Sequence, residues 1–428
     1  MSARRLGADL PAGWSGISIR RLFRVVGGAT PRSDQAAYWD SGSVPWFTPA
    51  DLSRASNLTV ETSARQITPE GLASCSAELL PAGSVLVSCR APIGYVAVTS
   101  TDAATNQGCK ALVGDRVDPR FVAYQLSVAT EDLIALGQGT TFAELSGESL
   151  ADFSIAIPWP LRDATSIADF LDRETAKIDA LIAKQKQLIA TLQEDRIATI
   201  TLAVTRGMNA SVAAVGESWP GEVPPHWVVG KVKYYFDVVL GKMYQGEQMR
   251  QGDAFLPHLK AGNLTSNGLM MEDPMFCWFS PAEVVELNLR RGDVLVVEGG
   301  SIGRCVVLDQ DLPGWGFQKS LNRVRPRYRD LPEFLAYVLE AATASGYVSL
   351  LCGKATIPHF TAEKLGAMEY PRPPVDEQRA IVDFLTERDV QISLLSEQAT
   401  NVIDRLCEYR SALITDAVTG KIDVREMV

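Results

Sequence analysis

A basic segment in the last third of the chain has the residue spacing of a nucleic-acid contact. In KSLNRVRPRYR the basic residues share one parity, so on an extended strand they project from one face until Pro326 ends regular pairing. Such a face contacts phosphates. In the major groove, Lys or Arg can also read guanine, and Gln318 and Asn322 can read adenine. The other interpretation is a solvated face that balances acidic surroundings. Lys319 and Arg323 enter the predicted site.

Polar residues at turns elsewhere in the chain extend this predicted site. Glycine-rich turns near Arg90 and over residues 299–304 allow the backbone to approach a duplex closely. The complete set of predicted DNA-binding residues is Thr48, Asp51, Arg90, Asn106, Gln107, Lys110, Lys260, Asn263, Ser301, Arg304, Gln318, Lys319, Asn322 and Arg323.

The motifs of the chain indicate no catalytic chemistry. It has no GxxxxGK[ST] or GxGxxG loop and no Asp/Asn-Pro-Pro-Tyr/Phe tetrapeptide. Its three histidines, His226, His258 and His359, have no neighbour at metal-ligand spacing. A nuclease site built from Asp293 and Glu298 lacks the Lys that should follow, so both are interpreted as strand-end carboxylates. We therefore expect no catalytic residue, no metal and no cofactor in this chain.

Two long stretches, residues 167–207 and 381–421, are copies of each other. They align without a gap at a constant offset of 214 residues, which is half of the 428-residue chain. The matched pairs include Ile167/Ile381, Phe170/Phe384, Leu171/Leu385, Ile178/Ile392, Leu181/Leu395, Leu192/Leu406 and Arg196/Arg410. The chain is therefore interpreted as a tandem duplication.

The spacing of apolar residues predicts that both stretches are long helices. Neither contains Pro, and each is about 40 residues long, roughly 60 Å at the rise of an α-helix. The predicted helix-pair seam is Leu171, Ile178, Leu181, Leu188 and Leu192 in the first copy, and Leu385, Ile392, Leu395, Val402 and Leu406 in the second. An apolar stripe of this length needs a partner, and the nearest is the other copy. The alternative is a pair of ordinary amphipathic helices packed on a globular core.

The rest of the chain predicts two strand-rich heads. Short apolar runs follow Gly-containing turns at equivalent places, as in residues 85–87 and 294–296, and read as β-strands. The predicted boundaries are a first head at 1–160, a helix at 161–207, a linker at 208–225, a second head at 226–373, a helix at 374–420 and a tail at 421–428. The fold class is α+β, with two duplicated mixed α/β heads, each followed by a long helix.

Net charge, cysteine content and hydropathy limit the partners and the cellular compartment that we expect for this chain. The net charge of −10 has the wrong sign for a protein that binds DNA alone, so contact requires local basic patches or a basic partner. Seven cysteines without a CxxC pair favour reduced thiols. With no apolar leader and no 18-residue apolar run, we expect a soluble, cytoplasmic protein.

The first head carries an ordered set of motif residues: Gly28, Thr30, Pro31, Tyr38, Trp39, Gly42, Pro45, Trp46, Thr48, Asp51 and Leu52. The second half ends on Pro371–Pro374, Asp376-Glu377-Gln378, the long helix, and Thr419-Gly420-Lys421. In these motifs the chain resembles the specificity (S) subunit of Type I restriction–modification systems over essentially its whole length. Positions 163 and 164 hold Asp and Ala where 377 and 378 hold Glu and Gln, so the first half departs from the family's pattern there.

The resemblance implies a DNA-reading subunit without chemistry of its own. In this family each head is a target recognition domain that reads one half of a split DNA sequence. The two helices pack as an antiparallel coiled coil that fixes the gap between the half-sites. The implied partners are double-stranded DNA, two adenine methyltransferase subunits that use S-adenosylmethionine, and motor–nuclease subunits that use ATP and Mg²⁺.

Two other functions are compatible with the same residues. One is the specificity subunit of a related methyltransferase system without a motor. The other is a coiled-coil scaffold with two protein-binding heads that never touches DNA. An adjacent adenine-methyltransferase gene would favour the first over the second.

Overall fold

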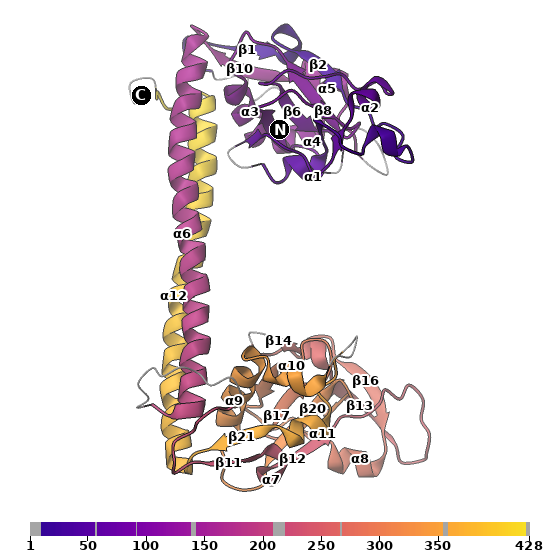
Figure 1. The fold of residues 1–428 in the computed structure, drawn as a ribbon, viewed down its shortest axis with the longest axis vertical. Helices are drawn as coiled ribbons and strands as arrows, with labels where there is room; N and C mark the ends of the chain where they lie inside the picture. The colour runs from indigo at the N-terminus through magenta and orange to yellow at the C-terminus, as the bar shows by residue number, and fades with distance from the viewer. Residues whose placement is uncertain are drawn as a thin grey trace. The chain divides into compact units, whose positions relative to one another are not determined.

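The computed structural model describes residues 10–55, 58–90, 92–137, 143–208, 219–265, 268–353 and 358–424. The chain divides into two compact units, Met1–Lys186 with Thr400–Val428, and Gln187–Ala399. Each unit therefore contains one head, half of the first long helix and half of the second (Figure 1). None of the helices in the described ranges is long and apolar enough to cross a membrane.

The head of unit 1 is built on a five-stranded sheet with the order β2-β9-β6-β7-β4. Its strands are Arg24–Gly27, Cys109–Val113, Val85–Ser88, Val96–Thr99 and Thr59–Val60 in that order. A three-stranded sheet has the order β5-β3-β8, with strands Gln66–Ile67, Val44–Phe47 and Ala104–Thr105. β1 (Trp14–Ser18) pairs with β10 (Ser154–Pro158). The helices are η1 (Ile19–Arg21), η2 (Ala36–Tyr38), α1 (Pro49–Leu52), α2 (Pro69–Ala73), α3 (Pro119–Val128), α4 (Thr130–Ala135) and α5 (Gly147–Asp152).

The head of unit 2 repeats this topology. Its four-stranded sheet has the order β12-β20-β17-β18, with strands Phe236–Leu240, Leu321–Pro326, Val294–Val297 and Cys305–Val307. The three-stranded sheet β16-β13-β19 contains Met275–Phe279, Ala254–Leu259 and Gly316–Phe317. The remaining pairs are β11 (Val228–Lys231) with β21 (Glu369–Arg372), and β14 (Leu264–Thr265) with β15 (Gly268–Leu269). The helices are α7 (Val232–Tyr235), α8 (Pro281–Glu286), η3 (Ala261–Asn263), α9 (Pro332–Ala344), α10 (Tyr347–Cys352) and α11 (Ala362–Ala367).

The central strands form because apolar runs follow tight turns that only glycine accommodates well. Gly83 and Gly292 adopt φ values of +85° and +83°, in the left-handed region, just before β6 and β17. Every residue of these two strands is buried. In each head one helix, α3 or α9, packs on this sheet and contributes Phe121 and Tyr124 or Phe334 and Val338 to the core. The predicted strands at 85–87 and 294–296 are therefore confirmed.

The two long helices lie close to their predicted bounds. α6 spans Arg162–Arg206, 45 residues, and α12 spans Val375–Val418, 44 residues. In the linker predicted at 208–225, residues 209–218 lie outside the described residues, as do residues 425–428 of the predicted tail.

The helix faces that become buried differ in part from the predicted seam. Leu171, Ile178, Leu385 and Ile392 are buried, and Leu192 and Leu406 are half-buried, as predicted. Leu181, Leu188, Leu395 and Val402 are 46%, 44%, 46% and 41% exposed, so their assignment to the seam was wrong.

The face that is buried or half-buried instead follows alternating steps of three and four residues. In α6 it comprises Ile178, Ile182, Gln185, Ile189, Leu192, Arg196, Thr199 and Ala203. In α12 it comprises Ile392, Ser396, Ala399, Ile403, Leu406, Arg410, Leu413 and Ala417, the same positions at the offset of 214. The prediction selected the large apolar residues, whereas the real face keeps the heptad register and admits small and polar side chains.

Within each unit the two helices contact each other. In unit 1, Ile178 of α6 and Leu413 and Ala417 of α12 belong to one buried cluster, and Arg410 pairs with Asp179 at 3.0 Å. In unit 2, Ile200 and Val204 of α6 share a cluster with Ile381 and Leu385 of α12, and Arg196 pairs with Asp389 at 2.7 Å. The first half of α6 therefore lies beside the last part of α12, and the second half beside the first part.

Candidate nucleic-acid interface

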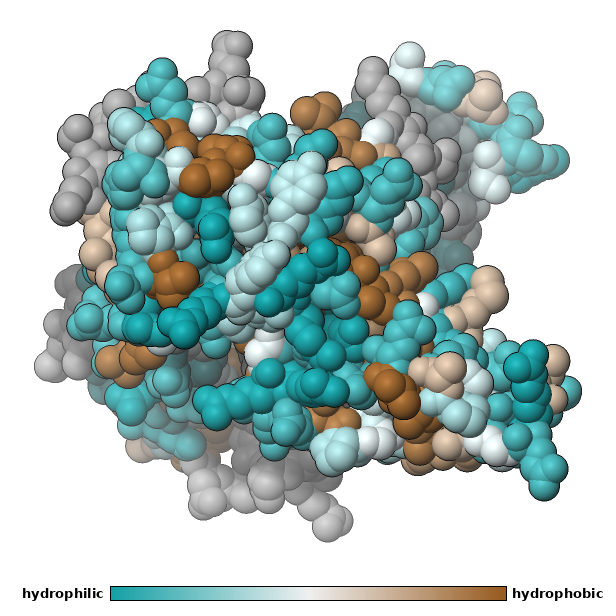
Figure 2. All heavy atoms as spheres, turned by 90° about the horizontal axis from the view of Figure 1, so that it is seen from below, coloured by the Kyte–Doolittle hydropathy of each residue, from teal (hydrophilic) through white to brown (hydrophobic). Residues whose placement is uncertain are grey.

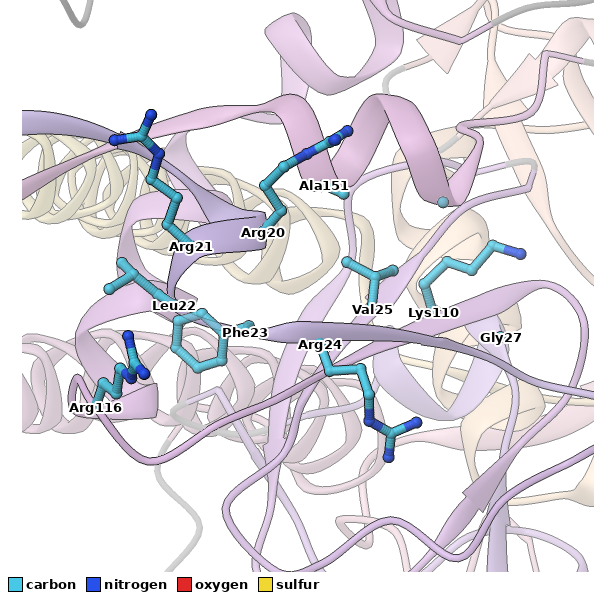
Figure 3. A pocket seen from close by; sticks show the side chains of 11 residues that line it. Arg20, Arg21, Leu22, Phe23, Arg24, Val25, Gly27, Lys110, Arg116 and Ala151 are labelled. Atoms are coloured by element: carbon cyan, nitrogen blue, oxygen red, sulfur yellow. The ribbon is translucent and has the colours of Figure 1, made fainter.

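Five cations surround a surface pocket of about 650 Å³ in the head of unit 1. They are Arg20, Arg21, Arg24, Lys110 and Arg116 (Figure 3). The pocket lies where the short helix η1 leads into β2, and β9 brings Lys110 opposite Gly27. Because the whole chain has a net charge of −10, this gathering of positive charge is a local feature.

Part of this positive charge is not neutralised by the protein. Arg20 pairs with Asp152 at 2.5 Å and Arg24 with Glu78 at 2.8 Å, and both arginines are exposed. Arg21 and Arg116 are exposed, and their guanidinium groups make no ion pair or hydrogen bond with the part of the chain that the structure describes. Lys110 is likewise unpaired among those residues and is half-buried. Three cations are thus available to an anionic ligand.

The cations extend on both sides of the strand rather than converging on one point. In Figure 3 the side chains of Arg20 and Arg21 extend to one side of the Leu22–Val25 backbone and that of Arg24 to the other. Spread charges of this kind suit an extended polyanion better than one isolated phosphate. Of the five, only Lys110 belonged to the predicted site. The Arg-rich IRRLFR segment was a readable signal, but Arg116 joins it only through the fold.

Two predicted residues of the first head form a helix cap. The Oδ2 atom of Asp51 accepts hydrogen bonds from the Thr48 amide at 2.9 Å and the Thr48 hydroxyl at 2.6 Å. Its Oδ1 atom accepts from the Ala64 amide at 3.0 Å, and Asp51 is buried. This is a capping box at the start of α1. Both side chains therefore shape the loop, and their groups are already occupied.

The other predicted residues of this head lie at the surface or at turns. Asn106 accepts the Gly108 amide at 2.9 Å and so fixes the turn that presents the exposed Gln107. Gln107 itself accepts a hydrogen bond from Thr30. Arg90 is exposed and pairs with Glu144 at 3.0 Å.

In the second head the equivalent loops are also held by local hydrogen bonds. Asn263 accepts the Lys260 amide at 2.9 Å and donates to the Met270 carbonyl at 2.8 Å, and its side chain is almost wholly buried. Ser301 and Arg304 are exposed, and Arg304 donates to the Leu264 carbonyl at 3.2 Å. Gln318 is half-buried, whereas Lys319 is exposed and its ammonium has no partner among the described residues.

Asn322 and Arg323 lie inside the second head, so their assignment to a DNA contact is corrected. Asn322 is fully buried and donates to the Phe360 carbonyl at 2.9 Å. Arg323 is 3% exposed and donates to the carbonyls of Glu286 and Asn288 at 2.7 and 2.8 Å. Burial, and then the neighbouring Arg325, lowers the pKa of Arg323. β20 is buried on both faces: the side of Asn322 meets Phe360, and the side of Arg323 meets the chain at Glu286 and Asn288.

The neighbouring basic residue Arg325 is also structural. Its guanidinium makes two hydrogen bonds, at 2.6 and 2.7 Å, to the fully buried carboxylate of Asp293. Asp293 lies at the start of β17, as the strand-end interpretation had it. Among the described residues no group of three or more His, Cys, Asp or Glu side chains has the arrangement of a metal site.

Comparison with known protein families identifies the family to which this chain is similar. The model of the Type I restriction modification DNA specificity domain matches residues 11–191 and 281–405, which is more than half of the chain. The chain belongs to this family. The match covers the basic pocket and β20.

Curated members of the family are similar to parts of the chain. The MjaIX specificity subunit of Methanocaldococcus jannaschii is 34% identical over 154 residues, 35% of this chain and 35% of that protein. The EcoR124I/EcoR124II specificity subunit of Escherichia coli is 28% identical over 162 residues, 36% and 39% of the two chains. The MjaVIII specificity subunit of M. jannaschii is 22% identical over 320 residues, 73% and 72%. The chain thus spans little more than a third of the first two relatives.

Solved structures share the fold. A chain from a structure of a type I R-M system complex superposes with a TM-score of 0.69 at 18% identity, covering 97% of this chain and all of that one. The HsdS subunit of Thermoanaerobacter tengcongensis superposes with a TM-score of 0.56 at 17% identity, covering 97% and 98%.

Proposed function

We propose that this chain is the DNA-specificity subunit of a Type I restriction–modification complex and has no catalytic site of its own. Each head reads one half of a bipartite target. The observation that carries the proposal is the set of cations around the pocket of the first head, which stands out in a chain with a net charge of −10.

The basic pocket is proposed to hold the phosphate backbone. Phosphate contacts release condensed counterions and dominate the affinity of protein–DNA complexes, but they carry no sequence information. Arg21, Lys110 and Arg116 are suited to this role because the described part of the chain leaves them unpaired.

Base reading is assigned to the exposed polar ends of the loops. These are Arg90, Gln107, Ser301, Arg304 and Lys319, together with the half-buried Gln318. Thr48, Asp51, Asn106, Lys260 and Asn263 are proposed to shape the loops that present them, because most of their polar groups serve caps and turns. Asn322 and Arg323 are not part of this proposal.

The long helices are proposed to form an antiparallel coiled coil that sets the distance between the two half-sites. This agrees with the halves of α6 and α12 that meet within each unit, and with the shared three–four register of their buried faces. The proposed partners are double-stranded DNA, adenine methyltransferase subunits that bring S-adenosylmethionine, and motor–nuclease subunits that bring ATP and Mg²⁺. The setting is proposed to be the cytoplasm.

A methylome tests the function directly. The chain is co-expressed with its methyltransferase subunit in a host without adenine methylation, and modified adenines are mapped. We expect a two-part motif with a fixed gap that appears only when this chain is present. Methylation without a motif, or the same motif without this chain, would favour the scaffold alternative.

The phosphate contact is tested with the purified complex of this chain and its methyltransferase. Arg21→Ala with Arg116→Ala removes two cations without leaving a carboxylate unpaired. The plot of log affinity against log salt should become less steep by about 2 units, with an unchanged motif. Lys184→Ala with Lys186→Ala, on the exposed face of α6, is the charge-matched control and should leave the slope unchanged. An unaltered slope in the pocket variant would exclude this pocket from the interface.

The spacer proposal is tested by adding one heptad to each helix, after Lys186 and after Ala399. Seven helical residues preserve the three–four register and add about 10 Å, roughly three base pairs of DNA. The gap in the methylated motif should lengthen while both half-sites stay the same. Seven residues inserted in α6 alone displace its second half by about two turns relative to α12. The original contacts between the two helices are then lost, and methylation should be abolished. An unchanged gap in the double insertion would reject the spacer role.

A further inference from the structure

One segment of the second head exposes an unusual number of large apolar side chains. Met243 and Met249 are 67% and 71% exposed, and Phe255 is 52% exposed. Met270, Met275 and Phe276 follow at 46%, 44% and 41%. Figure 2 shows one face of the molecule, on which hydrophobic residues in brown lie in groups between hydrophilic ones. Exposed apolar side chains scattered singly need no explanation, but a concentration within one short segment does.

These residues form an ordered surface on a sheet. In the antiparallel pair of β13 and β16, Phe255 lies opposite Trp278. The Phe255 ring stacks on Phe276 with centroids 5.5 Å apart and contacts Trp278 at 5.1 Å. The Trp278 amide donates to the Gln245 carbonyl at 3.0 Å, which fixes the segment carrying Met243 and Met249 along the same edge. We call the surface made by Phe255, Phe276 and Trp278, with Met243 and Met249 on the adjoining segment, the aromatic face. Met275 lies opposite His258 and projects to the other side of β16.

The aromatic face is not required for the core of its own domain. The neighbouring residues of β16, Cys277 and Phe279, point the other way and are buried with Leu259 and Phe317. Among the described residues of the first head no equivalent surface is present. By strand register, the places of Phe255, Phe276 and Trp278 are taken there by the polar residues Ser43, Gln66 and Thr68.

Charge distinguishes among the possible occupants. Residues 242–286 contain six acidic and three basic residues, a net charge of −3, with Glu283 paired to Lys242 at 2.5 Å. Glu272 and Asp273 directly precede the face and are exposed, as is Glu247. Phosphates would be repelled here, which argues against nucleic acid. A second copy would bring the same acidic rim to an isologous contact, which argues against self-association.

We propose that the aromatic face is a docking surface for a protein whose contact region is apolar and ringed by Lys and Arg, bound once per chain. Aromatic and methionine side chains are enriched at protein interfaces, and methionine adapts its shape to a partner. Methyltransferase subunits that dock alike on both halves would use features common to both heads. In the part of the chain that the structure describes, this face is present on one head only, so it fits a single additional contact. Lys260, whose ammonium lies 3.0 Å from the Met275 sulfur, marks its border with the DNA-reading loops.

The proposal is tested by site-specific crosslinking in the native host. A photo-crosslinking phenylalanine analogue replaces Phe276 in the full chain, and Tyr328, which is 66% exposed, is the control position. We expect one protein crosslinked through Phe276 but not through position 328, with the crosslinked peptide apolar and flanked by Lys or Arg. A crosslink to DNA, to a second copy of this chain, or to nothing would overturn the proposal.

A binding measurement with the purified crosslinked protein completes the test. It should bind the wild-type chain at one per chain, more tightly at low salt. Phe255→Ser with Phe276→Ser should weaken binding at least tenfold, since buried aromatic anchors dominate interface energetics. Tyr328→Ser with Leu350→Ser changes two apolar residues that are more exposed, at 66% and 77%, and should leave binding unchanged. Equal loss in both variants would overturn the proposal, and thermal unfolding checks that both are folded. Because the methylome reads the DNA function separately, failure here leaves that function intact.

Discussion

The two heads share a strand order but differ in what they bury between the same strands. In the first head Ser84 precedes β6 and Val113 ends β9, whereas the second head has Asp293 and Arg325 at these places. A second position differs in the same way. In the first head Ala111 of β9 lies opposite Leu86 of β6, whereas in the second head Arg323 of β20 lies opposite Leu295 of β17. One head therefore has an apolar interior where the other has buried charge. A duplicated topology tolerates both because each charge finds its partners locally.

The junctions between heads and helices also differ in one revealing way. Tyr124 donates to Asp172 at 2.7 Å and lies 3.2 Å from the Thr175 hydroxyl. Tyr337 donates to Asp389 at 3.0 Å and lies 3.5 Å from the Thr386 hydroxyl. At the offset of 214, Asp172 corresponds to Thr386 and Thr175 to Asp389, so acid and hydroxyl have exchanged places. Burial raises the pKa of Tyr337 to about 12 and that of Tyr124 further.

The largest expected effect comes from breaking the buried ion pair of the second head. Arg325→Ala leaves the Asp293 carboxylate buried without its partner, and should cost about 3–5 kcal/mol of unfolding free energy. Urea unfolding measures the loss of unfolding free energy, and hydrogen exchange over residues 294–326 shows where in the head it occurs. Arg329→Ala, an exposed arginine, is the control and should cost less than about 0.5 kcal/mol.

The same comparison can be sharpened by copying the first head. Asp293→Ser with Arg325→Val installs the residues of the first head, and should recover most of the stability lost in Arg325→Ala, since apolar replacements of buried ion pairs are often neutral. A double variant as unstable as the single one would show that the two interiors are not interchangeable.

A smaller difference in stability is expected between the loss of Arg196 and the loss of Arg410, which form ion pairs between the two long helices. Arg196 makes two hydrogen bonds to Asp389, at 2.7 and 3.1 Å, and also binds Glu340, with a side chain 22% exposed. Among the described residues Arg410 pairs with Asp179 alone, which is 38% exposed. We expect Arg196→Ala to cost about 2 kcal/mol and Arg410→Ala about 1 kcal/mol. Chemical denaturation of both variants decides the order, and equal costs would contradict it.

The side chains at the caps of the two equivalent loops should differ in their contribution to stability by about 0.5–1 kcal/mol. Thr48→Ala removes a hydroxyl that bonds Asp51, whereas Lys260→Ala removes a side chain whose backbone amide makes the corresponding bond to Asn263. The first variant should be destabilised by about 1 kcal/mol and the second by less than about 0.5 kcal/mol in thermal unfolding. Asn263→Ala in the second head is the counterpart of Asp51→Ala in the first, because both remove the side chain that accepts the cap amide.

The smallest expected difference is in pH dependence. His258 takes the place of Trp46, is buried, and has no hydrogen-bond partner for either ring nitrogen among the described residues. Burial, and then Lys260, lowers its pKa in the folded state. Below the ordinary value of about 6.5 the unfolded chain takes up a proton that the folded chain refuses, so stability falls as the pH drops towards the folded pKa and is unaffected above 6.5. His258→Phe should remove this component of the pH profile of unfolding, and an identical profile would contradict the assignment.

Much of the fold could be predicted because its signals are local. The long helices and the strands after Gly83 and Gly292 are indicated by apolar patterns with periods of a few residues. The repeat is indicated by matching residues at an offset of 214. The helix seam was partly missed because size was taken as the guide, whereas Gln185 and Arg196 lie on the less exposed face in preference to Leu181 and Leu188.

The site was harder to predict because it depends on which strands become neighbours. The parity of Lys319 and Arg323 is visible in the sequence, but the carbonyls of Glu286 and Asn288 that bind the buried Arg323 lie 37 and 35 residues away in the chain. The basic pocket joins Arg20, Arg21 and Arg24 with Arg116 across more than 90 residues. The cap made by Thr48 and Asp51, by contrast, has a sequence signature that could have been read directly.

The exchanged acid and hydroxyl beside Tyr124 and Tyr337 bear on how such a chain can change over generations. In either arrangement the phenol meets one carboxylate and one threonine on the adjoining helix. A crossover that joined one head to the other helix would therefore still give its tyrosine both partners. The contact between head and helix is therefore interchangeable, so that recombination could replace one head without compensating substitutions in the adjoining helix.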